Sequence, residues 1–214
     1  MTPPLVIALD GPAASGKGTL ARALAAHFGL PHLDTGLLYR AVGAAALEKA
    51  VSFEDVEALA GLAARLDIAG LDAEALRAGP VGEAASKVAA IPQVRAKLLT
   101  LQQDFARQPG GAVLDGRDIG TVIAPEAPVK FFVTATPEAR AARRHAELRG
   151  RGETIDFADV LADIERRDAR DSGRASAPLK AAPDAVTLDN THLGPEQCFF
   201  AALAILADRL PDPD

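Results

Sequence analysis

The sequence predicts a three-layer α/β fold built around a central parallel sheet. Short, continuous apolar runs alternate with longer amphipathic runs, and continuous apolar strands are typical of a sheet that helices cover on both faces. Proline follows Thr136 and Gly194, where two amphipathic runs begin, and its missing N–H costs nothing in the first turn of a helix. At 214 residues, the chain has room for one domain with one sizeable core.

Compact apolar runs are the expected strands, because buried strands of a parallel sheet are short and apolar on both faces. In chain order they are Leu5–Leu9, His32–Leu33, Ala112–Leu114, Val129–Val133 and Val186–Leu188. Ligands of such folds gather at the carboxyl ends of the strands, so we expect the binding site along that edge of the sheet.

The amphipathic runs between these strands are the expected helices. Ser52 and Asp55 form a capping pair near the start of the third helix. The expected helices are Thr19–Phe28, Gly36–Glu48, Phe53–Arg65, Pro92–Arg107, Pro137–Leu148, Phe157–Asp171 and Pro195–Arg209.

Two stretches interrupt the alternation of strands and helices. Asp67–Ala90 is mixed in character and punctuated by glycine, and Arg149–Thr154 is a polar break between two arginine-rich helices. We expect both to be mobile surface insertions.

Composition and charge narrow the classes of function. The net charge of −6 argues against a general nucleic-acid binder, which needs a basic face. The single cysteine, Cys198, excludes an internal disulfide, fits a reducing compartment and is expected in the core. Met1–Leu9 lacks the basic region of a signal peptide, and no apolar run reaches the roughly 20 residues of a membrane helix. We therefore expect a cytoplasmic protein without membrane or nucleic-acid partners.

A phosphate-binding loop is the strongest functional signal in the sequence. Its glycines permit a turn tight enough for backbone N–H groups to point inward, and the following helix adds its positive dipole end. Its lysine can reach the β- and γ-phosphates of a nucleoside triphosphate. The expected ATP-binding residues are Gly11, Pro12, Ala13, Ala14, Ser15, Gly16, Lys17, Gly18 and Thr19.

One departure from the usual loop concerns the magnesium ligand. Gly18 stands directly after Lys17, where a serine or threonine is usual, and the hydroxyl comes one residue later at Thr19. We expect Mg²⁺ to be held mostly through water and phosphate oxygens, with Thr19 as a weaker ligand. Asp115, at the end of an expected strand, stands where a magnesium-facing carboxylate belongs.

A GTPase is disfavoured by the same sequence. Guanine recognition would want an Asn-Lys-x-Asp segment, which the chain lacks. Asp67-Ile-Ala-Gly70 matches the loose Asp-x-x-Gly switch pattern, but it follows an amphipathic helix instead of a strand.

A second set of residues suits an acceptor that is itself a phosphate ester. Thr35 opens a helix that carries Tyr39 and Arg40, and Arg117 with Asp118 follows Asp115 on a strand-end turn. Guanidinium groups bind phosphate through two parallel hydrogen bonds, which orient the ligand. Arg40 taken alone fits a surface ion pair equally well.

Nine arginines lie between residues 140 and 174, against eight acidic residues, so the segment is locally basic in an acidic chain. On the last helix of this segment, Arg167 stands four residues before Asp171 and Arg170 four before Arg174, so one face presents several guanidinium groups. This face could supply the cations that a bound triphosphate needs. The alternative interpretation is a solvent-exposed helix whose arginines form ion pairs with its acidic residues.

Together these motifs resemble the bacterial cytidylate kinase family. The matching segments run from Asp10 to Thr19, Leu33 to Arg40, Leu114 to Thr121, Pro128 to Phe132, and Arg166 through Leu179. The resemblance implies a P-loop kinase fold with a core, a small monophosphate-binding lobe and a lid. It also implies transfer of the γ-phosphate of ATP to CMP or dCMP, with Mg²⁺, in pyrimidine nucleotide metabolism. We expect one domain over residues 1–214, with the monophosphate-binding region at about 35–108 and the lid at about 145–156.

The resemblance also implies roles for individual residues. The acceptor phosphate would contact Arg40, Arg117 and Arg167; the cytosine edge would contact Ser86, Arg95, Asp118 and Arg174; the sugar would face Tyr39 and Asp171, with Thr35 nearby. The lid region would contain Arg143, Arg144 and Arg149, and Asn190 and Thr191 would lie near the adenine. Charge on the transferred group would be neutralised by Lys17, Arg143, Arg144 and Arg170.

The segment Asp67–Glu83 departs from many members of this family, because it is short and offers no good hairpin. Two other functions stay open: another P-loop kinase acting on AMP, UMP or an alcohol, and a nucleotide-dependent switch or ATPase subunit. The set Arg40, Arg117 and Arg167 disfavours an unphosphorylated acceptor, and Gly18 disfavours the switch. The sequence shows no apolar stripe beyond core needs, so we expect a monomer.

Overall fold

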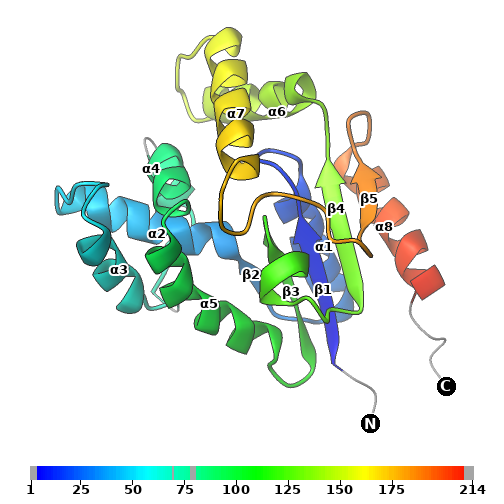
Figure 1. Cartoon of the computed structure of the whole chain (residues 1–214). Helices are drawn as coiled ribbons and strands as arrows, with labels where there is room; N and C mark the ends of the chain where they lie inside the picture. Colours follow the sequence, from blue (N-terminus) through cyan, green and yellow to red (C-terminus); the bar gives the residue numbers. More distant parts are fainter. Residues whose placement is uncertain (1–3, 69, 78–80, 210–214) are drawn as a thin grey trace.

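Five parallel strands form the middle layer of the part of the chain that the computed structural model describes, residues 4–68, 70–77 and 81–209. Their order across the sheet is β2-β3-β1-β4-β5, as Figure 1 shows. Their bounds are β1 Leu5–Asp10, β2 His32–Asp34, β3 Gly111–Gly116, β4 Val129–Thr134 and β5 Val186–Asp189. The predicted parallel sheet is confirmed, with each strand slightly longer than expected.

Helices follow the strands in the expected order. Their bounds are α1 Lys17–Phe28, α2 Thr35–Glu48, α3 Val56–Ala64, α4 Val81–Val88, α5 Pro92–Ala106, α6 Pro137–Gly150, α7 Phe157–Ser172 and α8 Pro195–Arg209, with a 3₁₀ turn, η1, at Ala75–Arg77 and a π-helical turn, η2, at Ile119–Ile123. Each expected helix is present with ends within a few residues of those predicted.

Helix caps agree with the sequence in one case and differ in another. The Thr136 hydroxyl accepts the Ala139 N–H ahead of α6, with Pro137 in the first turn. At α3 the cap is Asp55 itself, whose carboxylate accepts the Ala58 N–H at 3.0 Å. The Ser52 hydroxyl instead accepts the Glu54 N–H in the preceding turn. The predicted capping pair was therefore wrong in its geometry, although both side chains accept backbone N–H groups.

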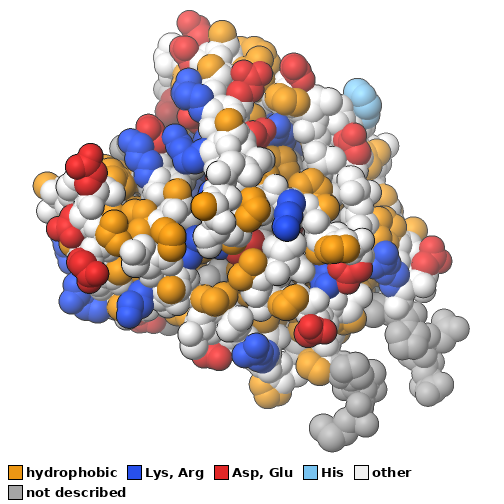
Figure 2. Space-filling view, in the orientation of Figure 1, with side chains coloured by type: hydrophobic (Ala, Val, Ile, Leu, Met, Phe, Trp, Pro, Cys, Tyr) orange, Lys and Arg blue, Asp and Glu red, His pale blue; other side chains and the backbone are white. Residues whose placement is uncertain are grey.

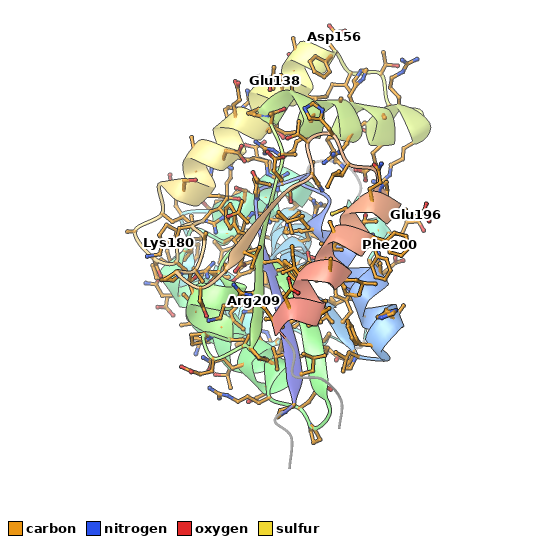
Figure 3. All side chains as sticks on the ribbon, turned by 90° about the vertical axis from the view of Figure 1, so that its right-hand side faces the viewer. Glu138, Asp156, Lys180, Glu196, Phe200 and Arg209 are labelled. Atoms are coloured by element: carbon orange, nitrogen blue, oxygen red, sulfur yellow. The ribbon has the colours of Figure 1, made fainter. Side chains whose placement is uncertain are left out.

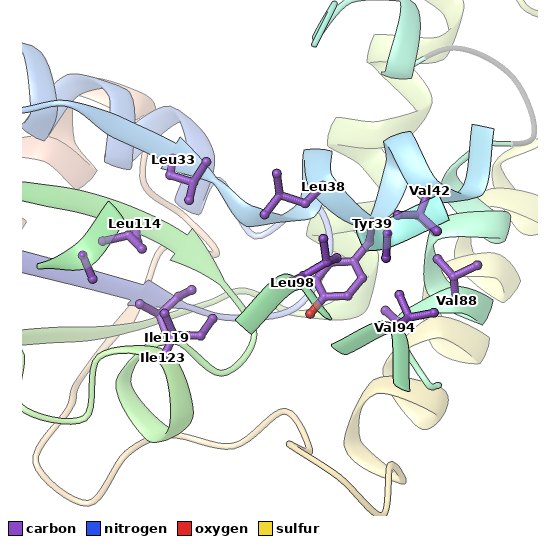
Figure 4. Packing of buried hydrophobic residues seen from close by; sticks show 14 of the residues in the cluster. Leu33, Leu38, Tyr39, Val42, Val88, Val94, Leu98, Leu114, Ile119 and Ile123 are labelled. Carbon is purple, nitrogen blue, oxygen red and sulfur yellow. The ribbon is translucent and has the colours of Figure 1, made fainter. Parts of the chain in front are cut away.

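The sheet separates two apolar cores. Alternate residues of β1 face opposite sides, with Val6 and Ala8 in one core and Ile7 and Leu9 in the other. The first core packs against α2 to α5, where Figure 4 shows Leu38 and Leu98 close together. The second packs against α1 and α8 and contains the buried Cys198, as predicted. Both faces of the sheet are covered, which fixes the strands rigidly beneath the loops at their carboxyl ends.

The structure corrects the expected surface insertion at Asp67–Ala90, because the end of this stretch forms the buried helix α4. This helix buries Ala84, Ala85 and Val88 and crosses α2 at Gly43, where an added Cβ would lie 2.9 Å from the Ala85 nitrogen. Small residues on both helices therefore permit a close backbone approach. Val81, Ala84, Ala85 and Val88 have the i, i+3, i+4, i+7 spacing of an amphipathic helix, but this pattern spans only eight residues within a stretch interrupted by glycine, and the sequence analysis missed it. No strand occurs between β2 and β3 among the described residues, and positions 69 and 78–80 lie outside them.

Helices α6 and α7 form a hairpin at the carboxyl edge of the sheet. Figure 3 shows Glu138 and Asp156 on this hairpin, well away from Arg209 at the end of α8. The two helices share a small apolar cluster of Ala141, Leu148, Val160 and Ile164, against which Ala14 of the phosphate-binding loop packs. The hairpin thus rests directly on that loop.

Two neighbouring glycines at the start of β3 provide a test of this geometry. Gly110 and Gly111 both have positive φ values, +89° and +105°, but an added Cβ would meet nothing within 4 Å at Gly110 and the Leu5 carbonyl oxygen at 2.1 Å at Gly111. We expect Gly110→Ala to lower the free energy of unfolding by about 1 kcal/mol, the cost of the backbone conformation alone. Gly111→Ala should cost several times more, since β1 and β3 must separate. Equal midpoints in urea unfolding would contradict this packing.

Candidate active site

The loop between β1 and α1 forms a cradle whose shape depends on two glycines. At Gly11 an added Cβ would lie 2.0 Å from the Val133 carbonyl oxygen, and at Gly16, with φ +88°, it would lie 2.8 Å from the Asn190 amide nitrogen. No side chain caps the N-terminus of α1. The first N–H groups of that helix are therefore available to an anion, as the sequence predicted.

Lys17 lies in the wall of the cradle and is only 8% exposed. Its ammonium donates to the Pro12 carbonyl at 3.2 Å. Burial, followed by the positive charge of Arg117, lowers the pKa of Lys17 to about 8. A buried ammonium next to an arginine is poised to bind a strongly anionic group such as a polyphosphate.

Arg143 and Asn190 support the cradle from behind. The Asn190 amide donates to the Ser15 carbonyl at 2.6 Å, and the Arg143 guanidinium donates to both the side-chain and the backbone oxygen of Asn190. These two residues also line a second cavity of about 310 Å³ beside the cradle, together with Leu193, Gly194, Pro195 and Cys198. Arg143 thus contacts the loop rather than the main cleft.

Thr191 and Arg149 are among the predicted residues that line neither cavity. The Thr191 hydroxyl donates to Asp189 at 2.6 Å and accepts the Thr136 N–H, and Thr191 lines neither cavity. Arg149 is exposed and also lines neither. Arg151, which the sequence analysis did not single out, lines the main cleft and pairs with Glu147 at 3.0 Å, as does Arg144 at 2.9 Å.

The candidate magnesium oxygens come from β3 and α1. The Asp115 carboxylate lies beside the first turn of α1, where an added Cβ on Gly18 would be 3.5 Å from Oδ2. Its other oxygen is 2.7 Å from Nε2 of His32, a partner that the sequence did not reveal. Thr19 and Asp115 both line the cleft. Carboxylate and hydroxyl oxygens suit Mg²⁺, so these residues fit the metal.

The protein alone offers few ligands for that ion. Among the described residues, no group of three or more His, Cys, Asp or Glu could hold a metal. The expectation that phosphate oxygens and water supply most of the coordination stays a prediction.

A cleft of about 400 Å³ opens between the cradle and helices α2, α4, α5 and α7. The guanidinium groups of Arg40 and Arg167 converge at Gly82, where an added Cβ would lie 3.6 Å from one and 3.8 Å from the other. Burial, followed by the positive charge of Arg117, lowers the pKa of Arg167, whose Nε has no hydrogen-bond partner. Figure 2 shows Lys and Arg side chains gathered between α4 and α7. The predicted trio of arginines is thus brought together in one wall.

Paired charges line the rest of the cleft. Arg95 pairs with Asp118, and Arg174 with Asp171, which also accepts from Arg117 Nε at 2.9 Å. Burial alone would raise the pKa of Asp171, but Arg117 and Arg174 outweigh it and hold the pKa below its usual range. Burial raises the pKa of Asp118 against the opposing effect of Arg95.

Three further predicted residues complete this wall. The Arg95 guanidinium lies 5.6 Å from the ring centre of Tyr39, whose buried hydroxyl has no hydrogen-bond partner. Ser86 accepts from Arg170 at 2.8 Å, and Arg170 itself lies outside the cleft lining. The Thr35 hydroxyl donates to the Asp115 carbonyl at 2.9 Å, which joins α2 to β3. Polar groups of opposite charge therefore surround a pocket large enough for a nucleotide.

A family model for cytidylate kinase matches residues 7–207. The chain belongs to the cytidylate kinase family. A cytidylate kinase from Xanthobacter autotrophicus is 64% identical over 96% of this chain and 98% of that protein, and one from Methylocella silvestris is 61% identical over 94% of each. The protein is therefore a nucleoside monophosphate kinase, which is a phosphotransferase.

Solved structures support the fold of this cytidylate kinase family member. A sugar kinase from Janibacter superposes with a TM-score of 0.51 at 17% identity, covering 98% of this chain and 97% of its own. An uncharacterized protein from Eubacterium ventriosum gives a TM-score of 0.55 at 14% identity, covering 96% of this chain and 99% of its own. The predicted P-loop kinase fold is confirmed. In the described part of the chain, no helix is long and apolar enough to span a membrane.

Asp10 joins the cradle of the kinase to the acceptor side. This buried carboxylate ends β1 and accepts the N–H groups of Ile119 at 2.7 Å and Gly120 at 2.8 Å, so it holds η2 beneath the cleft. No local sequence pattern predicts this contact, because the partners of Asp10 lie more than 100 residues away. Burial raises the pKa of Asp10 from 3.8 to about 6.

This shift predicts a pH dependence of stability. The folded protein binds the Asp10 proton more tightly than the unfolded chain, so the contribution of Asp10 is complete below about pH 4 and is lost as pH rises through 6. Relative to Asp10→Asn, which does not titrate, the free energy of unfolding should fall by about 2.5 kcal/mol between pH 4 and pH 8. Urea unfolding at several pH values measures this difference. A difference that stays constant would show that Asp10 is not perturbed.

Proposed function

We propose that this protein transfers the γ-phosphoryl group of ATP to CMP, and also to dCMP, giving ADP and the corresponding diphosphate. The family, the two adjoining cavities and the two opposed sets of cations support this reaction. The observation that carries the proposal is the convergence of Arg40, Arg117 and Arg167 in the cleft that Lys17 also lines. A cleft that presents Lys17 to one ligand and these three arginines to another suits two phosphorylated ligands that face each other.

ATP is the donor in this proposal. Its triphosphate follows the cradle and contacts Lys17, and its adenine enters the second cavity next to Asn190 and Leu193. Thr19 and Asp115 hold Mg²⁺ together with phosphate oxygens and water. When bound, the ion neutralises negative charge on the phosphates and helps to orient them.

CMP is the acceptor. Arg40, Arg117 and Arg167 bind its phosphate through charge-assisted hydrogen bonds. The cytosine edge meets the polar groups of Ser86, Arg95, Asp118 and Arg174, while Tyr39 and Asp171 face the sugar. A site built on such hydrogen bonds rejects bases that lack the matching atoms, because its buried polar groups are then left without partners.

The chemistry asks little covalent work of the protein. A bond forms between the γ-phosphorus and an oxygen of the CMP phosphate, while the bond from that phosphorus to the β,γ-bridging oxygen breaks. No general base is needed, since the attacking oxygen already carries negative charge. Lys17 and Arg144, which lines both cavities, neutralise charge on the transferred group. Arg143 acts indirectly, by holding Asn190 against the cradle, and Arg170 acts through its hydrogen bond to Ser86.

A single chain suffices for this reaction. Residues of one chain line both cavities and supply both cationic sets, so we propose that the protein acts as a monomer. Its single buried cysteine and acidic composition suit the reducing cytoplasm. The monophosphate-binding region that we propose, at about residues 35–108, includes α2 to α5, and the lid that we propose, at about residues 145–156, includes the end of α6 and the turn before α7.

A panel of acceptors tests the proposed substrate. ADP release should be measured with CMP, dCMP, UMP, AMP and an unphosphorylated alcohol of the shikimate type. We expect CMP and dCMP to be phosphorylated with the highest kcat/KM, since the cleft offers both phosphate-binding arginines and a polar base pocket. Preference for AMP over CMP would refute the assignment of the base. Activity on the alcohol alone would refute the acceptor-phosphate site.

Two neighbouring arginines on α7 test the acceptor phosphate site. Arg167→Ala removes a buried guanidinium of the cleft and should raise the KM for CMP at least about tenfold, with the KM for ATP within about threefold. Arg166→Ala removes a side chain that is 64% exposed and serves as the control, with both constants unchanged. Steady-state kinetics with each substrate varied in turn measures both. Equal increases in the two KM values would place Arg167 outside the acceptor site.

A further inference from the structure

An ion pair between a buried arginine and a partly exposed aspartate lies outside both cavities and joins the two helices of the hairpin. Arg140 of α6 is 3% exposed, and its two terminal nitrogens donate to the two carboxylate oxygens of Asp168 on α7, at 3.1 and 2.5 Å. Neither residue lines the main cleft or the second cavity. Such a two-pronged pair fixes the relative orientation of its partners as well as their distance.

The same guanidinium also holds the phosphate-binding loop. Arg140 donates to the Ala13 carbonyl of the cradle at 3.3 Å and to the Ala135 carbonyl, just before α6, at 2.9 Å. Ala14, the next residue of the cradle, packs against the apolar cluster of the hairpin. Arg140 therefore contacts the cradle, the end of β4 and α7 at once.

Asp168 is the point where this contact reaches the acceptor side. It follows Arg167 directly and precedes Asp171 by three residues on α7, so the pair lies within one helical turn of the cleft residues. Arg170 extends the same helix to α4 by donating to Ser86. A continuous set of hydrogen bonds thus runs from Ala13 through Arg140 and Asp168 to the helix that carries the acceptor-binding groups.

We propose that Arg140 and Asp168 are positioning residues for phosphoryl transfer, and that their ion pair sets the placement of the acceptor-binding helix relative to the cradle. The inference rests on the proposed function. Transfer between two bound phosphates requires the reacting atoms to lie close together and in line, and a misplacement of about 1 Å can cost about a hundredfold in rate. The apolar cluster holds the two helices of the hairpin together, whereas the ion pair fixes their orientation relative to each other and to the cradle.

Two conservative variants test the proposal. Asp168→Asn keeps the shape of the side chain and one acceptor for Arg140, and Arg140→Lys keeps the charge but loses the fork. We expect kcat at saturating ATP and CMP to fall at least about tenfold in each. Calorimetry should find the Kd of CMP alone and of ADP alone within about threefold of the parent values. Each binding site would then be intact and only their relative placement impaired.

Matched controls come from the same helix. Glu165→Gln and Arg166→Lys change exposed residues of α7 outside the cavity linings and should leave kcat unchanged. Thermal unfolding identifies the variants that fold, and if Asp168→Asn does not, Arg140→Lys carries the comparison. The double variant should be about as slow as the slower single variant, because the two residues act as one unit.

Two results would overturn the proposal. A folded variant of either residue with kcat within twofold of the parent would show that the ion pair does not position the reactants. A rise in the Kd of CMP or of ADP as large as the loss in kcat would show that the pair supports one binding site only. Failure of the proposed function is distinct, because the unaltered protein would then phosphorylate no CMP.

Discussion

Buried positive charge is the constraint on which the active site depends. Lys17, Arg117 and Arg167 line one cleft, and burial lowers the pKa of Lys17 and of Arg167 because a charged group loses favourable interactions with water. The Asp171 carboxylate offsets part of this cost and depends on the same arginines for its own low pKa. A bound anionic ligand would offset more of this desolvation cost than Asp171 does. The desolvation of these cations is thus the physical reason why the cleft favours an anionic ligand.

The parallel sheet explains how residues far apart in sequence meet in this cleft. In the register of the strands, Asp115 lies opposite both Leu9 and Asp34. The cradle after β1, the start of α2 after β2 and the turn after β3 therefore emerge side by side. Strands buried on both faces cannot slip, because a shift by one residue would move every side chain to the other core.

The arginine-rich segment serves two purposes that composition alone could not separate. Arg166 is an exposed member of a weak ion pair, as the alternative interpretation of the segment expected. Arg167 and Arg174 enter the cleft. Arg140 and Arg143 hold the cradle by donating to its carbonyl groups or to Asn190. Adjacent arginines of one helix point in different directions, so the role of each depends on the residues that it contacts.

The sequence by itself determined the strands, most of the helices and the phosphate-binding loop, because apolar periodicity and the spacing of Gly11, Gly16 and Lys17 are local properties. Motifs in the sequence also identified most arginines of the cleft, although not Arg151. Only the tertiary structure decided the partners: His32 on Asp115, Asp10 beneath η2, and the short helix α4 against Gly43. Those contacts join segments distant in the chain, and local pattern carries no information about which buried polar group will face another.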